Sequence, residues 1–253
     1  MANTLINVQA FKAGVDGKSG AGRKLVQFVE SESVEGLQAH TVNIITNDYV
    51  GDATVVAKGG KIPLSDMQQK SQAVSFEKIA KGVKITDEEL NQSFGDPLGN
   101  AENQTVKAIE GKMEAKVAEL FAQAKLTHQY TGEFGASTIL DAIAVFGEAY
   151  ETEENFLVVN PAEFAKLQGE IKGYDNSSLQ PTLYGATLVM STRVVAGQAV
   201  LIQKGAIKEL VQKDIDVELA RDASTKSTEI YTDRVYGAYI QDQSKILVIK
   251  PTE

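Results

Sequence analysis

One long amphipathic pattern in the middle of the chain constrains the fold more than any other sequence feature. A turn at Gly95-Asp96-Pro97 precedes it, and apolar residues then recur in steps of three and four, the spacing of one helix face. The pattern predicts a helix over roughly residues 100–126, about 40 Å long, which exceeds most helices in compact domains. We therefore expect a spine helix. Its predicted apolar face is formed by Val106, Ile109, Met113, Val117, Leu120, Phe121 and Ala124, with Ile109, Met113 and Val117 at its core.

The sequence before this helix predicts a loose arm followed by β-structure. Residues 1–38 carry five glycines and one short apolar run, which indicates an extended arm that lies against another surface. Residues 42–45 and 54–57 favour strands, and Gly51-Asp52 and Gly59-Gly60 favour the turns of a hairpin. A strand-like pattern continues from residue 74 to 86. The spacing of Thr86-Asp87-Glu88-Glu89 is then that of a capping box, which predicts the start of a short helix.

After Gly132 the pattern alternates between helices and strands, so the second half is α+β. Residues 137–150 are expected to be helical, and residues 155–159 form an apolar run typical of a buried strand. Asn160 is an N-cap candidate, and Pro161 occupies the first helical position, where its missing N–H does no harm. Further strands are expected at residues 188–190, 199–203, 229–241 and 245–250.

Composition excludes several classes of protein. The 253 residues include no cysteine, so a disulfide framework, a thiolate zinc site and a cysteine nucleophile are excluded. With 25 basic and 34 acidic residues the net charge is −9, which disfavours broad adhesion to nucleic acid. No signal peptide or membrane-spanning run is evident, so we expect synthesis and folding in the cytosol and no membrane partner.

The remaining chemical motifs have ordinary explanations. Gly17-Lys18-Ser19 lacks the glycine that a phosphate-binding loop requires five residues earlier, where Lys12 stands. His40 and His128 have no acid or serine at a recognisable spacing. The carboxylates of residues 87–89 suit the first turn of a helix, and the other acidic clusters are expected in loops. Calcium at Asp214 and Asp216 stays an alternative, although their loop lacks the Asp-x-Asp-x-Asp-Gly pattern of a dedicated site. A basic group at the N-terminus is expected to be solvated. We therefore predict no catalytic residue, no cofactor-binding residue and no metal ligand. The acidic clusters assigned to loops are Glu151-Glu153-Glu154 and Asp214-Asp216, and the basic group is Lys12, Lys18, Arg23 and Lys24.

The order of these parts resembles major capsid proteins of tailed double-stranded DNA bacteriophages with the Hong Kong 97-type fold. Two groups of segments carry the resemblance. In the first, a Gly/Pro-containing hairpin is followed by a strand and an acidic helix start. In the second, a strand leads into an Asn-Pro helix and then a Leu-x-Gly-x-x stretch. The matching segments are residues 60–63, 74–78 and 83–90 for the first group, and 156–161 with 183–189 for the second.

The resemblance implies a non-enzymatic subunit that assembles through hexamers and pentamers into an icosahedral head shell around double-stranded DNA, without sequence-specific binding. It implies a separate scaffolding protein or an already processed chain, a portal as partner, and a location in the virion after assembly in the host cytoplasm. It also implies a division of the chain into an N-terminal arm at 1–38, an extended hairpin loop at 39–75, a peripheral domain at 76–131, an axial domain at 132–220 and return strands at 221–253.

The hairpin loop is the predicted assembly contact. Its predicted contact residues are Val55, Val56, Lys58, Gly59, Gly60, Lys61 and Pro63. Some family members cross-link lysine to asparagine between subunits, but no motif here identifies an asparagine or a catalytic glutamate, so that chemistry is not expected. Two other readings stay open: an encapsulin-type compartment built from the same fold, and a monomeric hydrolase or binding protein.

Overall fold

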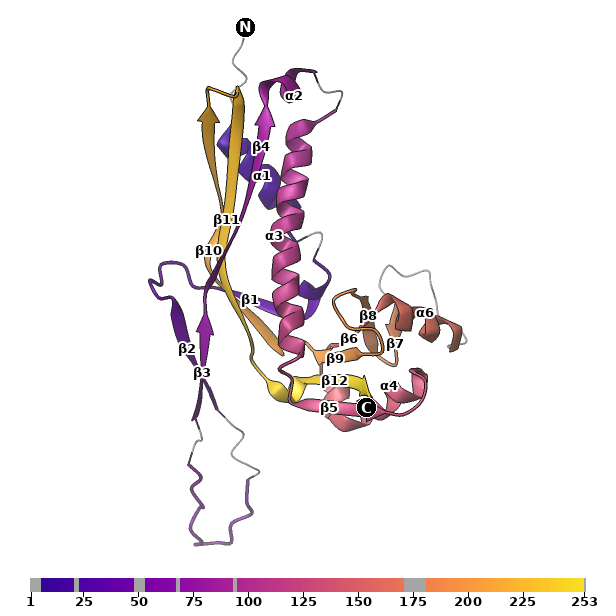
Figure 1. Ribbon diagram of the computed structural model, residues 1–253. Coiled ribbons are helices and arrows are strands. Elements are labelled where there is room, and N and C mark those ends of the chain that lie inside the picture. The colour runs from indigo at the N-terminus through magenta and orange to yellow at the C-terminus, as the bar shows by residue number, and fades with distance from the viewer. Residues whose placement is uncertain are drawn as a thin grey trace.

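A computed structural model describes residues 6–20, 23–47, 53–66, 69–92, 95–170 and 181–252. The described chain is α+β and contains a four-stranded sheet with a long helix beside it, a six-stranded sheet with smaller helices, and a two-stranded hairpin (Figure 1). No helix in these described ranges is long and apolar enough to cross a membrane.

The four-stranded sheet has the order β1-β10-β11-β4. Its centre is the long antiparallel hairpin of β10 (Ile207–Asp222) and β11 (Ser227–Ile240). β4 (Glu77–Thr86) pairs antiparallel with β11, and β1 (Val29–Ser33) pairs parallel with β10. Helices α1 (Val8–Lys18) and α3 (Pro97–Phe121) pack beside this sheet.

Helix α3 is the predicted spine. Asp96 caps its first turn by accepting a hydrogen bond from the Gly99 N–H at 2.9 Å, and Pro97 takes the first position. Its 25 residues correspond to about 37 Å, so the helix begins three residues earlier and ends about five residues earlier than predicted. Gly111 in its middle has a contact of its own, because Arg193 Nη2 donates to the Gly111 carbonyl at 2.6 Å.

The six-stranded sheet has the order β5-β12-β9-β6-β8-β7. Its central strands β6 (Asn155–Val159) and β9 (Ala199–Gln203) are buried at every residue. The expected cap of α6 (Pro161–Glu170) is present, because the Asn160 Oδ1 accepts from the Ala162 N–H at 3.1 Å. The remaining elements are β5 (Leu126–Tyr130), β7 (Thr182–Leu183), β8 (Ala186–Met190), β12 (Ile246–Pro251), α4 (Ala136–Phe146) and α5 (Ala149–Thr152).

The two-stranded hairpin consists of β2 (Thr41–Asn47) and β3 (Gln69–Ser75), which pair over seven residues. After β4, the short helix α2 (Asp87–Gln92) starts at the predicted capping box. The Thr86 N–H donates to Glu89 Oε2 at 2.8 Å, and the Glu89 N–H donates to Thr86 Oγ1 at 3.2 Å. Both halves of the predicted box are therefore formed.

The prediction of an arm without regular structure at the N-terminus was wrong. Asn7 caps α1 by accepting from Gln9 N at 2.9 Å, and the helix buries Phe11 and Val15 completely. Glycines in this segment led to the error. A Cβ at Gly14 would lie 2.5 Å from the Glu102 carboxyl group on α3, so a larger residue there would displace that side chain. A short 3₁₀ helix (Leu25–Phe28) and β1 follow.

Three further predictions need correction. Residues 54–57 form no strand, because nothing within the described chain pairs with them. The predicted helix over 137–150 is divided into α4 and α5 at Gly147, whose φ of +57° ends the helix. Asp214 and Asp216 lie in β10 and not in a loop. Register shifts between Val211 and Asp216 interrupt the strand's alternation, which hid β10 from sequence reasoning.

The sheets also divide the chain differently from the predicted domain boundaries. β10, inside the predicted axial range 132–220, belongs to the same sheet as β4. β5, inside the predicted peripheral range 76–131, belongs to the sheet of β6 and β9. The domain division itself stays a prediction, and these strands show where its limits would have to move.

Candidate assembly surface

The base of the hairpin is fixed to the body of the subunit by hydrogen bonds. The Phe76 N–H donates to the His40 carbonyl at 2.9 Å, directly beyond the last β2–β3 pair. From β10, Gln212 Nε2 donates to the Ala39 carbonyl at 3.0 Å and also to the Leu37 carbonyl. The two ends of the hairpin therefore leave the body at a defined position.

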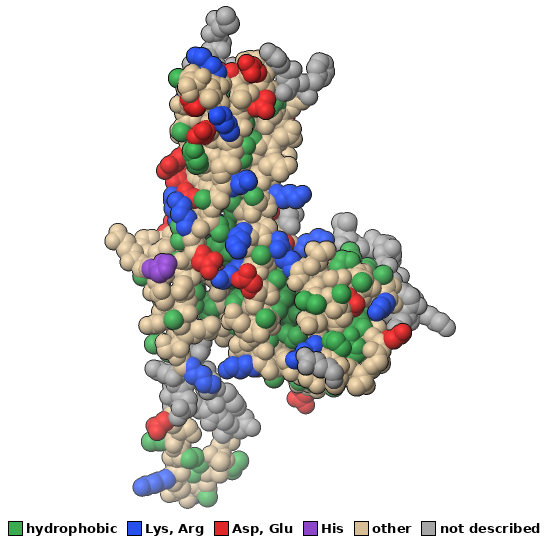
Figure 2. Space-filling view, viewed as in Figure 1, with side chains coloured by type: hydrophobic (Ala, Val, Ile, Leu, Met, Phe, Trp, Pro, Cys, Tyr) green, Lys and Arg blue, Asp and Glu red, His purple; other side chains and the backbone are tan. Residues whose placement is uncertain are grey.

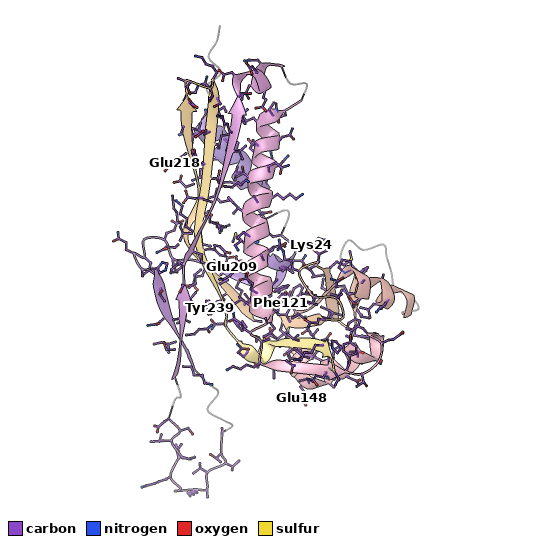
Figure 3. All side chains as sticks on the ribbon, in the orientation of Figure 1. Lys24, Phe121, Glu148, Glu209, Glu218 and Tyr239 are labelled. Atoms are coloured by element: carbon purple, nitrogen blue, oxygen red, sulfur yellow. The ribbon has the colours of Figure 1, made fainter. Side chains whose placement is uncertain are left out.

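Apolar packing reinforces this attachment. Val74 and Phe76 are each 3% exposed and form one cluster with Leu210 and Tyr239 of the four-stranded sheet. Tyr239 lies close to the point where β3 joins β4 (Figure 3). Gly237 permits the close approach, because a Cβ there would lie 3.0 Å from Val74 Cγ1 and 3.1 Å from the Ser75 carbonyl oxygen. The hairpin is a ribbon held at one end.

The far end of the hairpin, the loop of residues 53–66, contacts none of the rest of the described body and extends away from it (Figure 1). Every residue from 53 to 66 is exposed. A turn closes its tip, with the Gly60 N–H donating to the Ala57 carbonyl at 2.8 Å and Gly59 at φ +83°. A positive φ favours glycine, which explains the residue at the tip.

The loop presents apolar side chains to solvent. Val55 is 102% exposed, Leu64 96% and Ile62 76%, while Val56 is 37% exposed. Fully burying one such side chain typically contributes about 1.5–3 kcal/mol, a stabilisation that the subunit by itself does not obtain here. Contiguous exposed apolar residues mark interaction sites. The loop therefore has the composition of a contact surface that needs a partner.

Two lysines give the loop a positive charge. Lys58 and Lys61 flank the tip, and neither makes an ion pair with any described residue. In Figure 2 a cation projects at the end of the loop beside apolar side chains. The surface is therefore apolar with a basic tip.

All seven predicted contact residues lie on this loop, and the three predicted core residues lie elsewhere, on α3. The exposed fractions of Ile109, Met113 and Val117 are 2%, 0% and 0%. Ile109 and Met113 pack with Ile79 and with Tyr236, whose phenol pKa is raised by burial.

Sequence reasoning missed two exposed apolar residues of the loop, Ile62 and Leu64. The signal was available, because both flank Pro63 in a stretch that has no helical or strand periodicity.

The predicted basic group at the N-terminus is neither a free patch nor fully solvated. Arg23 is 8% exposed and forms a bidentate pair with the fully buried Glu209, through Nη1 to Oε2 at 3.1 Å and Nη2 to Oε1 at 2.5 Å. Glu209 lies on β10, and Figure 3 labels it beside α3. Lys18 Nζ pairs with Glu102 Oε2 at 2.6 Å, and the Lys24 N–H donates to Glu114 Oε1 at 2.5 Å.

The acidic clusters also have protein partners. Arg221 makes a bidentate pair with Asp87 at 2.6 and 2.5 Å, which holds the pKa of that carboxyl below its usual range. Lys213 lies 2.8 Å from Asp216 and likewise lowers its pKa. Lys245 pairs with Glu153, and Lys204 with Glu154. Across the described ranges, no group of three His, Cys, Asp or Glu residues is arranged to hold a metal ion.

Comparison with known proteins decides what this architecture is. A family model described as phage capsid protein matches residues 69–249. The major capsid protein of Staphylococcus phage phiMR11 is 34% identical over an alignment of 245 residues, and the match covers 89% of this chain and 86% of that protein. The chain belongs to the phage capsid protein family. It is a major capsid protein, a structural subunit of the phage head shell and a component of the virion.

Solved structures show that this phage capsid protein has the Hong Kong 97-type fold. The capsid of a native GTA particle matches with a TM-score of 0.72 and 13% identity, covering 91% of this chain and 90% of that one. The mature capsid of bacteriophage PhiM1 gives 0.64 and 13%, over 89% and 86% of the two chains. A virus-like particle from Pyrococcus furiosus gives 0.63 and 12%, over 97% and 100%. These likenesses concern the fold alone.

The family assignment also decides between the open readings of the sequence. The family is a structural one, which favours the head shell over a monomeric hydrolase or binding protein. The curated relative is a phage protein, which favours a virion over an encapsulin-type compartment.

Proposed function

We propose that this capsid protein assembles through hexamers and pentamers into a closed icosahedral shell, and that the loop of residues 53–66 is a main contact between neighbouring subunits. The observation that carries the proposal is the exposure of Val55, Ile62 and Leu64 on a ribbon whose base alone is anchored. A two-stranded ribbon is marginal in water unless something packs on it. A neighbouring subunit supplies that surface.

The shell would enclose double-stranded DNA without reading its sequence. The net charge of −9 leaves little electrostatic attraction of free subunits for phosphates, so DNA would be retained by enclosure. A scaffolding protein and a portal are the further partners that a shell of this kind needs. The four-stranded sheet with α3 would form the peripheral domain, and the six-stranded sheet would form the axial domain.

Deleting residues 57–62 tests the proposal. The deletion removes only exposed residues, so the subunit should keep its circular dichroism spectrum and its melting temperature. Closed shells should disappear in electron microscopy, because the contact is lost. A variant of unchanged length, with Val55, Ile62 and Leu64 replaced by Ser, is the matched control for chain shortening and should show the same two results. Normal particles from the deletion, or an unfolded subunit, would contradict the proposal.

A further inference from the structure

The segment of residues 54–58 has strand-forming side chains but no strand partner in its own subunit. Thr54, Val55 and Val56 are β-branched, a type enriched in strands, yet none of them pairs with a described residue. The neighbouring β2 and β3 do pair with each other over seven residues. A β-prone backbone of this kind can add to an exposed sheet edge on another chain.

The four-stranded sheet offers two edges, β1 and β4. In the described chain β1 pairs with β10 alone, and every residue from Glu30 to Ser33 is exposed. β4 is the opposite edge, and of its ten residues Ile79 and Ile85 are buried. Both edges could receive a strand on geometry alone.

Charge distinguishes the two edges. β1 and the residues after it carry Glu30, Glu32 and Glu35. Glu30 lies 3.8 Å from Lys208, but Glu32 and Glu35 form no ion pair with any described residue. β4 instead carries lysines on its exposed positions, and these would repel a basic loop. Those lysines are Lys78, Lys81 and Lys84. Lys78 lies 3.2 Å from Asp233, whereas Lys81 and Lys84 form no ion pair with any described residue.

We propose that the β1 edge of one subunit receives residues 54–58 of a second copy as an added strand, with Lys58 and Lys61 facing Glu32 and Glu35. The inference rests on the proposed role of the loop and specifies the surface that receives it. Backbone hydrogen bonds would supply the affinity, and the two pairs of opposite charges would select β1 over β4.

A charge exchange tests the assignment. Both Lys58→Glu with Lys61→Glu and Glu32→Lys with Glu35→Lys place like charges opposite each other, and each double variant should reduce the yield of closed shells about ten-fold. Combining all four substitutions restores opposite charges and should restore assembly. All four residues are exposed, so the isolated subunits should melt like the wild type.

The matched control places the two compensating lysines at positions away from β1. Glu88 and Glu148 are exposed and form no ion pair within the described chain. Adding Glu88→Lys and Glu148→Lys to the variant with Lys58→Glu and Lys61→Glu changes the net charge by the same amount as adding Glu32→Lys and Glu35→Lys. It should not rescue shells. Rescue by this control, or no rescue by the Glu32 and Glu35 substitutions, would overturn the β1 assignment.

The charge exchange and the deletion together separate an error in the β1 assignment from an error in the proposed role of the loop. If the charge exchange fails while deletion of residues 57–62 still abolishes shells, the loop remains an assembly contact but binds another surface. If the deletion leaves shells intact, the role of the loop is wrong.

The chain has no cysteine, so introduced thiols give an independent readout. With Lys58 opposite Glu32 and Lys61 opposite Glu35, Ala57 lies opposite Ser31, and both are exposed. In assembled particles, Ala57→Cys with Ser31→Cys should therefore form multimers with a short bis-maleimide. Ala57→Cys with Lys81→Cys on β4 should not. Multimers from the β4 pair alone would also contradict the proposal.

Discussion

Val117 and Met113 lie on the same buried face of α3, but their surroundings differ. Val117 is surrounded by the apolar cluster that includes Leu25, Phe28 and Leu120. Met113 also packs against apolar residues, but its Sδ lies 3.6 Å from Arg234 Nη1. A carboxylate at 113 would therefore be near a cation, whereas one at 117 would have none.

We predict that Val117→Asp destabilises the subunit more than Met113→Asp. An unpaired buried carboxylate typically costs several kcal/mol, which is comparable to the total stability of a domain. Met113→Asp should also destabilise, but less, and Met113→Leu is the volume-conserving control that should cost under about 1.5 kcal/mol. Guanidinium unfolding gives the free energy of unfolding of each of the three variants, and so the order of their destabilisation. Equal or reversed losses for the two aspartates would show that Arg234 has no influence at position 113.

The pair of Arg23 and Glu209 connects the N-terminal segment to β10 in the interior. Glu209→Gln leaves the buried guanidinium without its counter-ion and should lower the free energy of unfolding by about 3–5 kcal/mol. Replacing both residues, with Arg23→Met and Glu209→Leu, should cost less than the single change. A Glu209→Gln variant that melts like the wild type would mean that the N-terminal segment is not part of the cooperative fold.

At the scale of elements, the start of α2 gives a prediction about pH. Hydrogen bonds from the Thr86 N–H and hydroxyl lower the pKa of Glu89 below its usual value. A lowered folded-state pKa means that this stabilisation is present above the unfolded pKa of about 4.3 and is lost as pH falls through the folded value. The melting temperatures of wild type and Glu89→Gln should therefore differ at pH 7, and the difference should shrink as the pH falls below about 4.3. A difference that does not depend on pH would contradict this origin.

Elements with local signals could be predicted from sequence, and elements defined by contacts could not. The cap at Asn160, the capping box at Thr86 and the apolar face of α3 each lie within one stretch of sequence. α1 was missed because glycines make its sequence resemble a loop, whereas its buried Phe11 and Val15 pack against elements that are remote in sequence. β10 was missed because its irregular register disrupts the alternation that identifies a strand.

At the scale of the whole molecule, the order of elements indicated the fold, whereas the domain division stays a prediction. Each sheet combines strands that are far apart in the chain: β12 pairs with β5, and β1 pairs with β10. A division into consecutive ranges cannot represent such pairing. The exposure of residues 53–66 was predictable because glycines and a proline identify an unpaired ribbon, and their role in assembly stays a prediction. The surface proposed to receive the loop leaves no pattern within one segment.

The central claim is that this capsid protein forms closed shells through its extended loop. Electron microscopy of assembled particles, at a resolution that traces the backbone, tests it most directly. We predict closed shells in which residues 53–66 of each subunit lie against a neighbouring subunit, with Val55, Ile62 and Leu64 buried at the contact. Shells in which this loop remains in solvent, or folds back onto its own subunit, would contradict the account.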